Sequence, residues 1–373
     1  MEDKILSFDD SPKTKERIKR VSVPLATSNP YDPATSPPDI LQYLPPDGST
    51  FGLFSDPYAH MAYHMPKTGN HSAKFWLKSR LEEHSFTDHE VGLIHFLSTH
   101  RCATRSQIQK AIFKDTDNPY KVRDFIQKSH QRGIISAFSW ITPCQDGRKK
   151  PLVYGLTPTG AEAADRLFHS RVPREFKFQP IQFPMGAAPK MMTFFPYLVA
   201  NELYCQLKGV DRLIRWERNQ HIQLSDQTHF RPNYVAEVIK DAGDFKTLWI
   251  EVIRITDDWY ERTVARFREI QNALEKISPH LKPDRIIIIA DSDSRIPIIA
   301  AIAEEHMPDA VLRFSTDERL LSGMNEHTFL LYDPFGTELK ASPIPFLLPG
   351  ASGMTASDFL ATQVIDVEEE FEF

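Results

Sequence analysis

Between residues 86 and 169, apolar positions recur every three or four residues in three successive stretches and then switch to strand-like spacing. Apolar residues at spacings of three and four lie on one face of an amphipathic helix, so the pattern predicts three helices. Thr87 or Asp88 can cap the first helix, Thr104 the second and Asn118 the third, because these side chains accept hydrogen bonds from the free N–H groups of a helix start.

A β-hairpin is predicted directly after the third helix. Residues 134–142 and 152–156 have strand composition, and the polar turn between them contains Gly147. Three helices followed by a hairpin predict a winged helix-turn-helix, whose third helix fits the major groove of DNA and whose wing lies against flanking phosphate. The candidate DNA-binding residues are Tyr120, Lys121, Gln127, Lys128, Arg132, Arg148, Lys149 and Lys150.

The second half of the chain alternates helical stretches with strands. The apolar run Ile286–Ala290 predicts a strand buried on both faces, with helices on both sides of a mixed sheet. Their order, αβββαβ, is the core of the PD-(D/E)xK or restriction-endonuclease-like fold, so the chain as a whole is predicted to be α+β or α/β. The expected elements are a helix over 194–207, strands over 213–224, 233–240 and 246–255, a helix over 258–277 and a strand over 285–290.

The nuclease-like order indicates where a metal-dependent reaction would take place. Mg²⁺ prefers anionic oxygen ligands, and a lysine beside it positions or polarises the attacking water. The corresponding positions are Asn233 and Glu251, with Ile253 where the lysine is expected. Asn233 offers only a neutral carbonyl and Ile253 no ammonium group, so we expect an inactive domain with no catalytic residue, no metal and no cofactor. Mg²⁺ would enter only if a displaced lysine restored activity.

The ends and connections differ in composition from both domains. Ten of the 28 prolines lie in residues 1–66, and proline fixes φ and lacks a backbone donor, so an extended arm is expected. Four more prolines between 171 and 190 indicate a linker. The predicted organisation is a proline-rich arm over 1–85, a winged helix over 86–170, a linker over 171–192, a nuclease-like domain over 193–345 and an acidic tail over 346–373.

The last residues of the chain alternate acidic and apolar side chains. Such an end is either a frayed, solubilising tail or a short peptide that docks on a basic partner surface. The candidate partner-binding residues are Asp366, Glu368, Glu369, Glu370, Phe371 and Phe373.

Charge is distributed unevenly along the chain. The whole sequence carries a net charge of −6, whereas residues 86–169 hold 12 Lys and Arg against 8 Asp and Glu, a net charge of +4. The remainder therefore carries −10. Because a polyanion responds to the local field, this asymmetry supports nucleic-acid binding by the first module despite the acidic total.

Several classes of protein are excluded on sequence grounds. No apolar run approaches the roughly 18 residues that span a membrane, and the first residues lack the pattern of a signal peptide. Three scattered cysteines make neither a disulfide framework nor a zinc cluster, and no phosphate-binding Gly-rich loop of the Gly-x-x-x-x-Gly-Lys type occurs. We therefore expect a reduced, cytoplasmic protein with no membrane partner.

Three short motifs carry a resemblance to a known family. They are Leu156-Thr157-Pro158-Thr159-Gly160 after the hairpin, Arg231-Pro232-Asn233, and Leu248-Trp249-Ile250-Glu251-Val252. With them, residues 86–315 resemble the replication-relaxation family of plasmids and integrative elements, which is linked to plasmid replication and to mobilisation. Members typically have Asp where this chain has Asn233, and often Asp in place of Ile253. The resemblance implies DNA binding in an element-borne replication or transfer complex.

The expected function is that of a non-enzymatic, DNA-binding accessory protein of a mobile element. It would bring replication, transfer or transposition proteins to a site on double-stranded DNA, as a possible homodimer. One alternative is a metal-dependent endonuclease of the PD-(D/E)xK type that uses Glu251. The other alternative is a protein-interaction scaffold whose winged helix binds no DNA and whose charged face is simply solvated.

Overall fold

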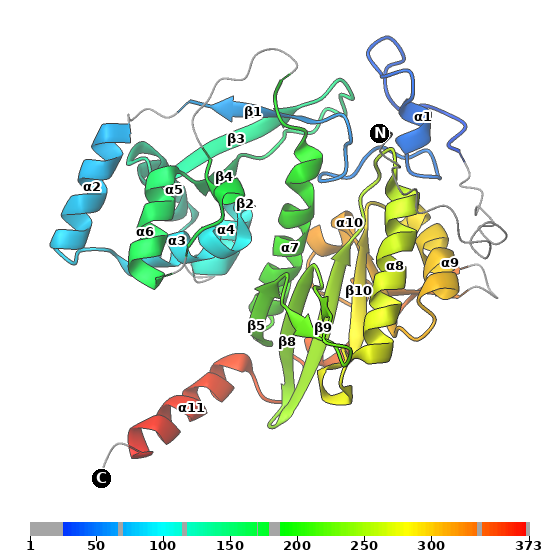
Figure 1. The fold of residues 1–373 in the computed structure, drawn as a ribbon. Helices are drawn as coiled ribbons and strands as arrows, with labels where there is room; N and C mark the ends of the chain where they lie inside the picture. The colour runs from blue at the N-terminus through cyan, green and yellow to red at the C-terminus, as the bar shows by residue number, and fades with distance from the viewer. Residues whose placement is uncertain are drawn as a thin grey trace, which may run out of the picture.

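The computed structural model describes residues 25–65, 70–113, 118–169, 171–178, 187–333 and 338–370; the side chains of residues 70 and 364–370 lie outside this description. The fold mixes helices with several sheets (Figure 1). A module of helices and a small sheet lies beside a larger sheet that helices cover. Within the described residues, every helix is too short or too polar to cross a lipid bilayer.

The first part of the chain forms the helical module and its four-stranded sheet. The sheet has the order β1-β3-β4-β2, with every pairing antiparallel. The elements are α1 (Ile40–Tyr43), β1 (His60–His64), α2 (Asn70–Glu82), α3 (Asp88–His100), β2 (Cys102–Thr104), α4 (Arg105–Ile112), α5 (Pro119–Gln131), β3 (Ile135–Ile141), β4 (Val153–Leu156) and α6 (Pro158–Phe168).

The three predicted helices α3, α4 and α5 are confirmed, together with their caps. The side chains of Thr87 and Thr104 each accept a hydrogen bond from the backbone N–H three residues later. In return, the side chains of Glu90 and Gln107 accept a hydrogen bond from the backbone N–H of Thr87 and Thr104, respectively. Asn118 caps α5, whose first residue is a proline. These capping boxes satisfy donors that would otherwise lack partners, which is why the helices begin at these residues.

The predicted extended arm is partly wrong, because it contains regular structure. Strand β1 pairs with β3 and enlarges the sheet of the hairpin, and residues 70–82 form helix α2, which packs against α6. Arm residues including Tyr31, Phe51 and Phe54 are buried. The arm therefore supplies core surface to the rest of the molecule, although its irregular stretches keep the extended character that proline imposes.

The larger sheet has seven strands in the order β13-β12-β11-β10-β9-β8-β5. Strands β9, β10 and β11 run parallel, and the outer pairings are antiparallel. Its elements are α7 (Phe195–Gly209), β5 (Leu213–Arg218), β8 (Tyr234–Asp241), β9 (Asp244–Val252), α8 (Trp259–Lys276), β10 (Arg285–Ala290), α9 (Ile296–His306), β11 (Leu312–Thr316), α10 (Asp317–Leu321), β12 (Leu330–Asp333), β13 (Glu338–Ala341) and α11 (Ala356–Glu370), with a separate hairpin of β6 (Ile222–Gln223) and β7 (His229–Phe230).

Strand β10 is buried on both faces, as its composition predicts. Ile287 and Ile289 belong to the core on the α7 side, whereas Ile286 and Ile288 pack with α8 and α9 on the other side. The predicted order of helix, three strands, helix and strand corresponds to α7, β5, β8, β9, α8 and β10. The single expected strand 213–224 is instead divided at Asn219, which has a positive φ of 50°.

Helix α7 stands between the helical module and the larger sheet and is shared by both (Figure 1). Leu198 and Leu203 pack in one core with residues of both sheets, and Cys205 packs in the core of the module. Phe176 and Phe178, in the segment predicted as a linker, are also buried; residues 179–186 lie outside the described part. The two parts consequently share hydrophobic core.

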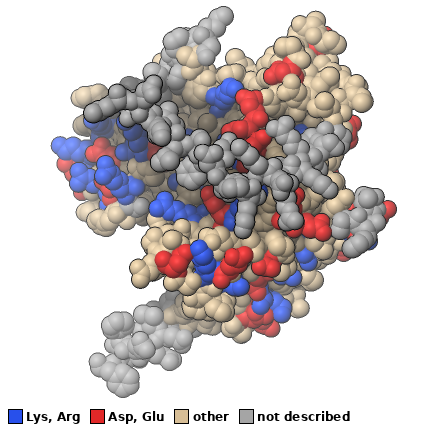
Figure 2. All heavy atoms as spheres, turned by 45° about the vertical axis from the view of Figure 1, so that its right-hand side comes forward, with Lys and Arg blue, Asp and Glu red and all other residues tan. Residues whose placement is uncertain are grey.

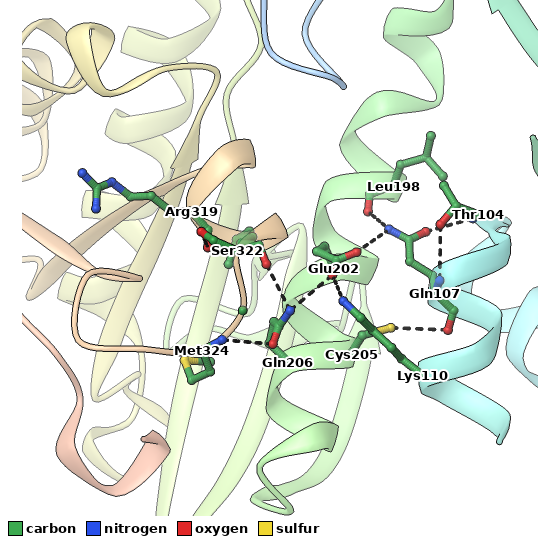
Figure 3. A network of polar contacts seen from close by, with 12 residues as sticks. Thr104, Gln107, Lys110, Leu198, Glu202, Cys205, Gln206, Arg319, Ser322 and Met324 are labelled. Atoms are coloured by element: carbon green, nitrogen blue, oxygen red, sulfur yellow. Dashed lines mark hydrogen bonds and ion pairs between the residues drawn. The ribbon is translucent and has the colours of Figure 1, made fainter. Parts of the chain in front are cut away.

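A buried polar network reinforces this junction (Figure 3). Glu202 of α7 is 2% exposed, and its carboxylate accepts hydrogen bonds from Gln107 of α4 at 3.2 Å and Gln206 at 3.3 Å. Lys110 of α4 forms an ion pair with the same carboxylate. Gln206 donates a further bond to the carbonyl of Leu320 in α10. The carboxylate of Glu202 thus joins α4 to α7, and Gln206 joins α7 to α10.

Removing the cation from this pair should destabilise the protein. In Lys110→Met, Glu202 keeps its buried charge without an ionic partner, and we expect a loss of about 1–2 kcal/mol in the free energy of unfolding, measured by urea denaturation. Lys110→Met combined with Glu202→Leu should recover part of that loss. Lys128→Met, which breaks an exposed ion pair with Asp124, should cost less than about 0.5 kcal/mol. Equal losses for the two single variants would contradict this account.

Candidate nucleic-acid interface

A groove lies between helix α5 and the β3–β4 hairpin. It has a volume of about 620 Å³. Arg123 and Gln127 line it from α5, and Lys149 from the hairpin turn. Tyr154 of β4 and Arg105, the first residue of α4, also border it. The groove therefore gathers three cations from three elements that are separated in the sequence.

A second hollow of about 620 Å³ continues from the first. Arg105, Lys149 and Tyr154 border both hollows, and Lys110 and Lys150 line only the second. The far side of the second hollow is formed by arm residues and by α7 and the end of α10. Together the two hollows form one basic channel, which we call the hairpin groove.

The cations of the hairpin groove differ in how far their charge is already balanced. Arg105, Arg123 and Lys149 are exposed, and none of the described carboxylates forms an ion pair with them. Lys110, by contrast, is paired with Glu202. The three unpaired cations therefore leave a positive field in the groove, where an anionic ligand would be attracted.

The other predicted residues of α5 have varied surroundings. Tyr120 is 78% exposed, and Lys121 is exposed as well. Lys128 pairs with Asp124 at 2.7 Å on the solvent face. Arg132 is bound inside the module, because its guanidinium lies 2.6 Å from the carboxylate of the buried Glu90. Its geometry gives it a structural role.

The hairpin turn is partly occupied by contacts within the molecule. Arg148 forms an ion pair with Glu318 of α10 at 3.1 Å, and Lys150 one with Asp146 at 2.8 Å. Cys144, at the start of the turn, is buried among residues of the arm. Only Lys149 of the three predicted wing cations is exposed without an acidic partner among the described residues.

Charge on the surface follows the sequence asymmetry only in part. Lysine and arginine side chains gather at the left of Figure 2, whereas acidic and basic side chains alternate over its lower part. The backbone of α11 includes positions 366 and 368–370, the acidic positions of the predicted partner-binding tail. The side chains of Asp366, Glu368, Glu369 and Glu370, and all of Phe371 and Phe373, lie outside the described residues.

The second candidate site surrounds Glu251 at the end of β9. Its carboxylate is 2% exposed and lies next to Asn233, which immediately precedes the neighbouring strand β8. Asn233 donates its backbone N–H to Oε1 at 3.2 Å and its side-chain amide to Oε2 at 2.6 Å. The two positions that the sequence aligned with the nuclease pattern, 233 and 251, are therefore in direct contact.

An arginine completes this site. Arg266 of α8 donates from Nη2 to Oε1 of Glu251 at 2.7 Å and from Nε to Oε2 at 3.0 Å. Burial raises the pKa of Glu251, and the charge of Arg266 opposes that increase. Arg266 is fixed in turn by Glu269 at 3.1 Å and by the ring of Phe230.

These residues do not fit a magnesium site. Both oxygens of Glu251 are directed at hydrogen-bond donors, and Ile253 is buried in the hydrophobic core beside α8. In the described part of the chain, no three His, Cys, Asp or Glu side chains are grouped as metal ligands. The arginine supplies the positive charge that this buried carboxylate requires, so no step of a metal-dependent reaction follows from the geometry.

Comparison with known proteins gives one result. The family model described as replication-relaxation matches residues 94–303, more than half of the chain. The chain belongs to the replication-relaxation family. Membership connects it with the replication of mobile elements. Neither a curated protein nor a solved structure matches it.

In this replication-relaxation protein, Arg105 and Arg123 are candidate residues that the sequence analysis missed. The residues predicted on α5 include Lys121, Lys128 and Arg132 on one stripe and Gln127 beside it. Of these only Gln127 lines the groove, together with Arg123. The spacing of four between Arg123 and Gln127 was available as a signal. Arg105 could have been found from its position directly after the Thr104 cap, where an exposed helix start faces the groove.

The ion pair of Arg266 with Glu251 should be necessary for the stability of this replication-relaxation protein. Arg266→Met should lower the free energy of unfolding by about 2–4 kcal/mol at pH 7, because the buried carboxylate loses its cation. With its pKa raised further in the folded state, Glu251 binds a proton more tightly folded than unfolded, so the loss should shrink as the pH falls toward 5. Urea denaturation at several pH values measures both effects.

The control for that variant is on the same helix. Arg262 pairs with Asp258 at the exposed start of α8, and Arg262→Met should change the free energy of unfolding by less than about 0.5 kcal/mol. A loss in Arg266→Met that is equally large at pH 5 and pH 7 would show that packing, and not the charge of Glu251, explains the destabilisation.

Proposed function

We propose that this member of the replication-relaxation family is a non-enzymatic DNA-binding accessory protein of a mobile element. Its hairpin groove binds the backbone of double-stranded DNA, and its larger domain serves as a platform for replication or transfer proteins. The observation that carries the proposal is the convergence of Arg105, Arg123 and Lys149 on one groove, with no acidic partner among the described residues.

The arrangement of the module supports a winged helix-turn-helix. Helices α3, α4 and α5 precede the β3–β4 hairpin, and α5 and the hairpin turn border the same groove. In such modules the third helix enters the major groove while the wing contacts the adjacent backbone. In this arrangement Arg123 and Gln127 face the DNA, with Tyr120 and Lys121 at the start of the same helix.

Of the predicted wing cations, only Lys149 is exposed without an acidic partner among the described residues. Arg148 and Lys150 are neutralised by Glu318 and Asp146, so their contribution to a polyanion is small. Arg105, which the sequence prediction did not include, joins Lys149, because both residues border both hollows of the groove. A duplex bound here lies between α5 and the hairpin and is directed toward the larger domain.

The element order and the residues of the larger domain support its interpretation as a nuclease-like platform without nuclease chemistry. Its elements follow the αβββαβ order, and positions 233 and 251 meet as in the PD-(D/E)xK fold. Arg266 occupies the electrostatic position of the metal, and Ile253 replaces the lysine. A fold that keeps this shape while losing the reactive groups offers its surface for protein contacts, which fits an accessory role.

The groove cations should determine both the affinity for DNA and its dependence on salt. Each substitution Arg105→Gln, Arg123→Gln or Lys149→Gln should weaken binding to a random duplex, and should reduce the slope of log K against log salt by about 1, because one phosphate contact is lost. Fluorescence anisotropy with a labelled duplex at several salt concentrations measures the slope.

Lys128→Gln is the matched control, because Lys128 lies on the same helix but pairs with Asp124 away from the groove. It should leave the slope nearly unchanged. Equal effects of Lys128→Gln and Arg123→Gln would contradict the groove, and the absence of salt-dependent binding in the unmodified protein would favour the protein-interaction scaffold. Metal-dependent nicking that is lost in Glu251→Ala would favour the endonuclease.

A further inference from the structure

A separate basic hollow lies at the edge of the larger sheet where β10 begins. It has a volume of about 590 Å³. Arg285, the first residue of β10, borders it together with Lys240 and Lys246 from the β8–β9 hairpin. The loop that contains Ser352 and Gly353 forms the opposite wall, and the remaining polar group on its border is Asp241. This hollow, which we call the β10 pocket, is distinct from the hairpin groove.

A second arginine lies beside Arg285 on the same face of the sheet. Arg313 of β11 pairs in register with Ile287 of β10, and Ile287 is two residues after Arg285. Residues two apart on a strand, and residues paired across neighbouring strands, lie on one face. Lys246 is also on this face, because it lies two residues before Leu248 on β9, and Leu248 is the register partner of Arg285. Three cations therefore follow one another across β9, β10 and β11.

The two arginines have no anionic partner among the described residues. Their Nε atoms are buried without a hydrogen bond, and the one bond from Arg313 goes to the carbonyl of Leu312 at 2.8 Å. Burial and the adjacent Arg285 lower the pKa of Arg313. Two half-buried guanidinium groups that repel each other are an unfavourable arrangement, and a bound anion would relieve it.

The lysines and the loop complete the walls of the pocket. Lys246 is held by Asp244 at 2.9 Å and Asp284 at 3.4 Å, so the lysine rim is partly neutralised while Arg285 is not. The loop is fixed by Arg212, which donates to the carbonyls of residues 351 and 352 at 2.7 and 2.9 Å. Gly353 has a φ of +107°, and a Cβ there would lie 2.2 Å from the carbonyl oxygen of residue 240, so only glycine allows this close approach.

We propose that the β10 pocket binds a phosphoryl group, with Arg285 as its principal donor and with the neighbouring Arg313 adding to the positive field. Guanidinium groups present several N–H donors in a planar fork that matches the oxygens of phosphate, and such charge-assisted bonds are among the strongest in proteins. The same chemistry is available from a small phosphate ester and from the backbone of a nucleic acid. The pocket therefore adds an anion site on the domain that carries the inactive nuclease-like centre.

The test is a calorimetric titration with inorganic phosphate at constant ionic strength. The unmodified protein should bind phosphate in a saturable manner, and Arg285→Gln should weaken the binding by at least about tenfold. Arg268→Gln removes an exposed charge on α8, on the other side of the sheet, and should have no effect. Arg285→Lys keeps the charge but not the fork; it should bind with intermediate affinity, and it serves as a second variant if Arg285→Gln does not fold.

Stability without phosphate gives an independent measurement. Because Arg285 repels Arg313, Arg285→Gln in chloride buffer should unfold at the same urea concentration as the unmodified protein or at a higher one. If the role of Arg285 were purely structural, Arg285→Gln would unfold at a lower urea concentration than the unmodified protein. Unchanged binding of both phosphate and duplex DNA in Arg285→Gln, or a clear loss of stability in chloride, would overturn the proposal.

A second titration distinguishes the two sources of the phosphoryl group. Labelled duplex DNA is titrated against the unmodified protein, Arg285→Gln and the groove variant Arg123→Gln. Phosphate binding that is lost in Arg285→Gln with DNA affinity unchanged indicates a small phosphate ester, whereas DNA affinity that falls without saturable phosphate binding indicates the nucleic-acid backbone. If neither titration responds to Arg285→Gln, the site does not exist. Because Arg123→Gln should leave phosphate binding intact, failure of the hairpin groove and failure of the β10 pocket are told apart.

Discussion

The structure depends on helix α7, because this helix is shared by the core of the helical module and by the core of the larger sheet. Its apolar side chains pack on both sheets, and the buried carboxylate of Glu202 binds α4 through Gln107 and Lys110. A buried charge of this kind is tolerated only where its partners are correctly placed, so it specifies one docking of the module against the sheet. The hairpin groove consequently has a fixed direction relative to the larger domain. A ligand in that groove lies beside the end of α10, and a protein docked on the sheet domain would be held at a constant angle to it.

The centre around Glu251 shows how a carboxylate can stay buried when hydrogen-bond donors and a cation surround it. A buried carboxylate without compensation would be costly, and in this chain the compensation comes from two donors of Asn233 and two of Arg266. This arrangement conflicts with metal binding, since a divalent cation and a guanidinium compete for the same oxygens. The neutral Asn233 and the arginine Arg266 both act as donors to Glu251, so the two residues are consistent with one another.

The sequence predicted best the features that depend on neighbouring residues. The caps Thr87, Thr104 and Asn118 act within one turn of their helices, so their identity was sufficient to place α3, α4 and α5. The isoleucines of β10 likewise predicted a strand buried on both faces. Helix α2 and strand β1 were missed because nearby prolines dominated the interpretation of the arm, whereas β1 is stabilised by pairing with the distant β3. The partner of Glu251 could not be predicted, because Arg266 of α8 and Glu251 of β9 come into contact only in the folded protein.

Contacts between residues that are distant in the sequence also neutralise positive charges. This explains why net charge is a poor guide to the binding surface of this chain. Arg132, Arg148 and Lys150 count toward the basic character of residues 86–169, yet each is neutralised by an acidic group, and for Arg148 that group belongs to the second half of the chain. Arg285 contributes to a region with an acidic total, yet it has no counter-ion among the described residues. An anion responds to the charge that remains after internal pairing. Among the described residues, unpaired cations line the hairpin groove, and the unpaired Arg285 borders the β10 pocket in the part of the chain whose composition is acidic.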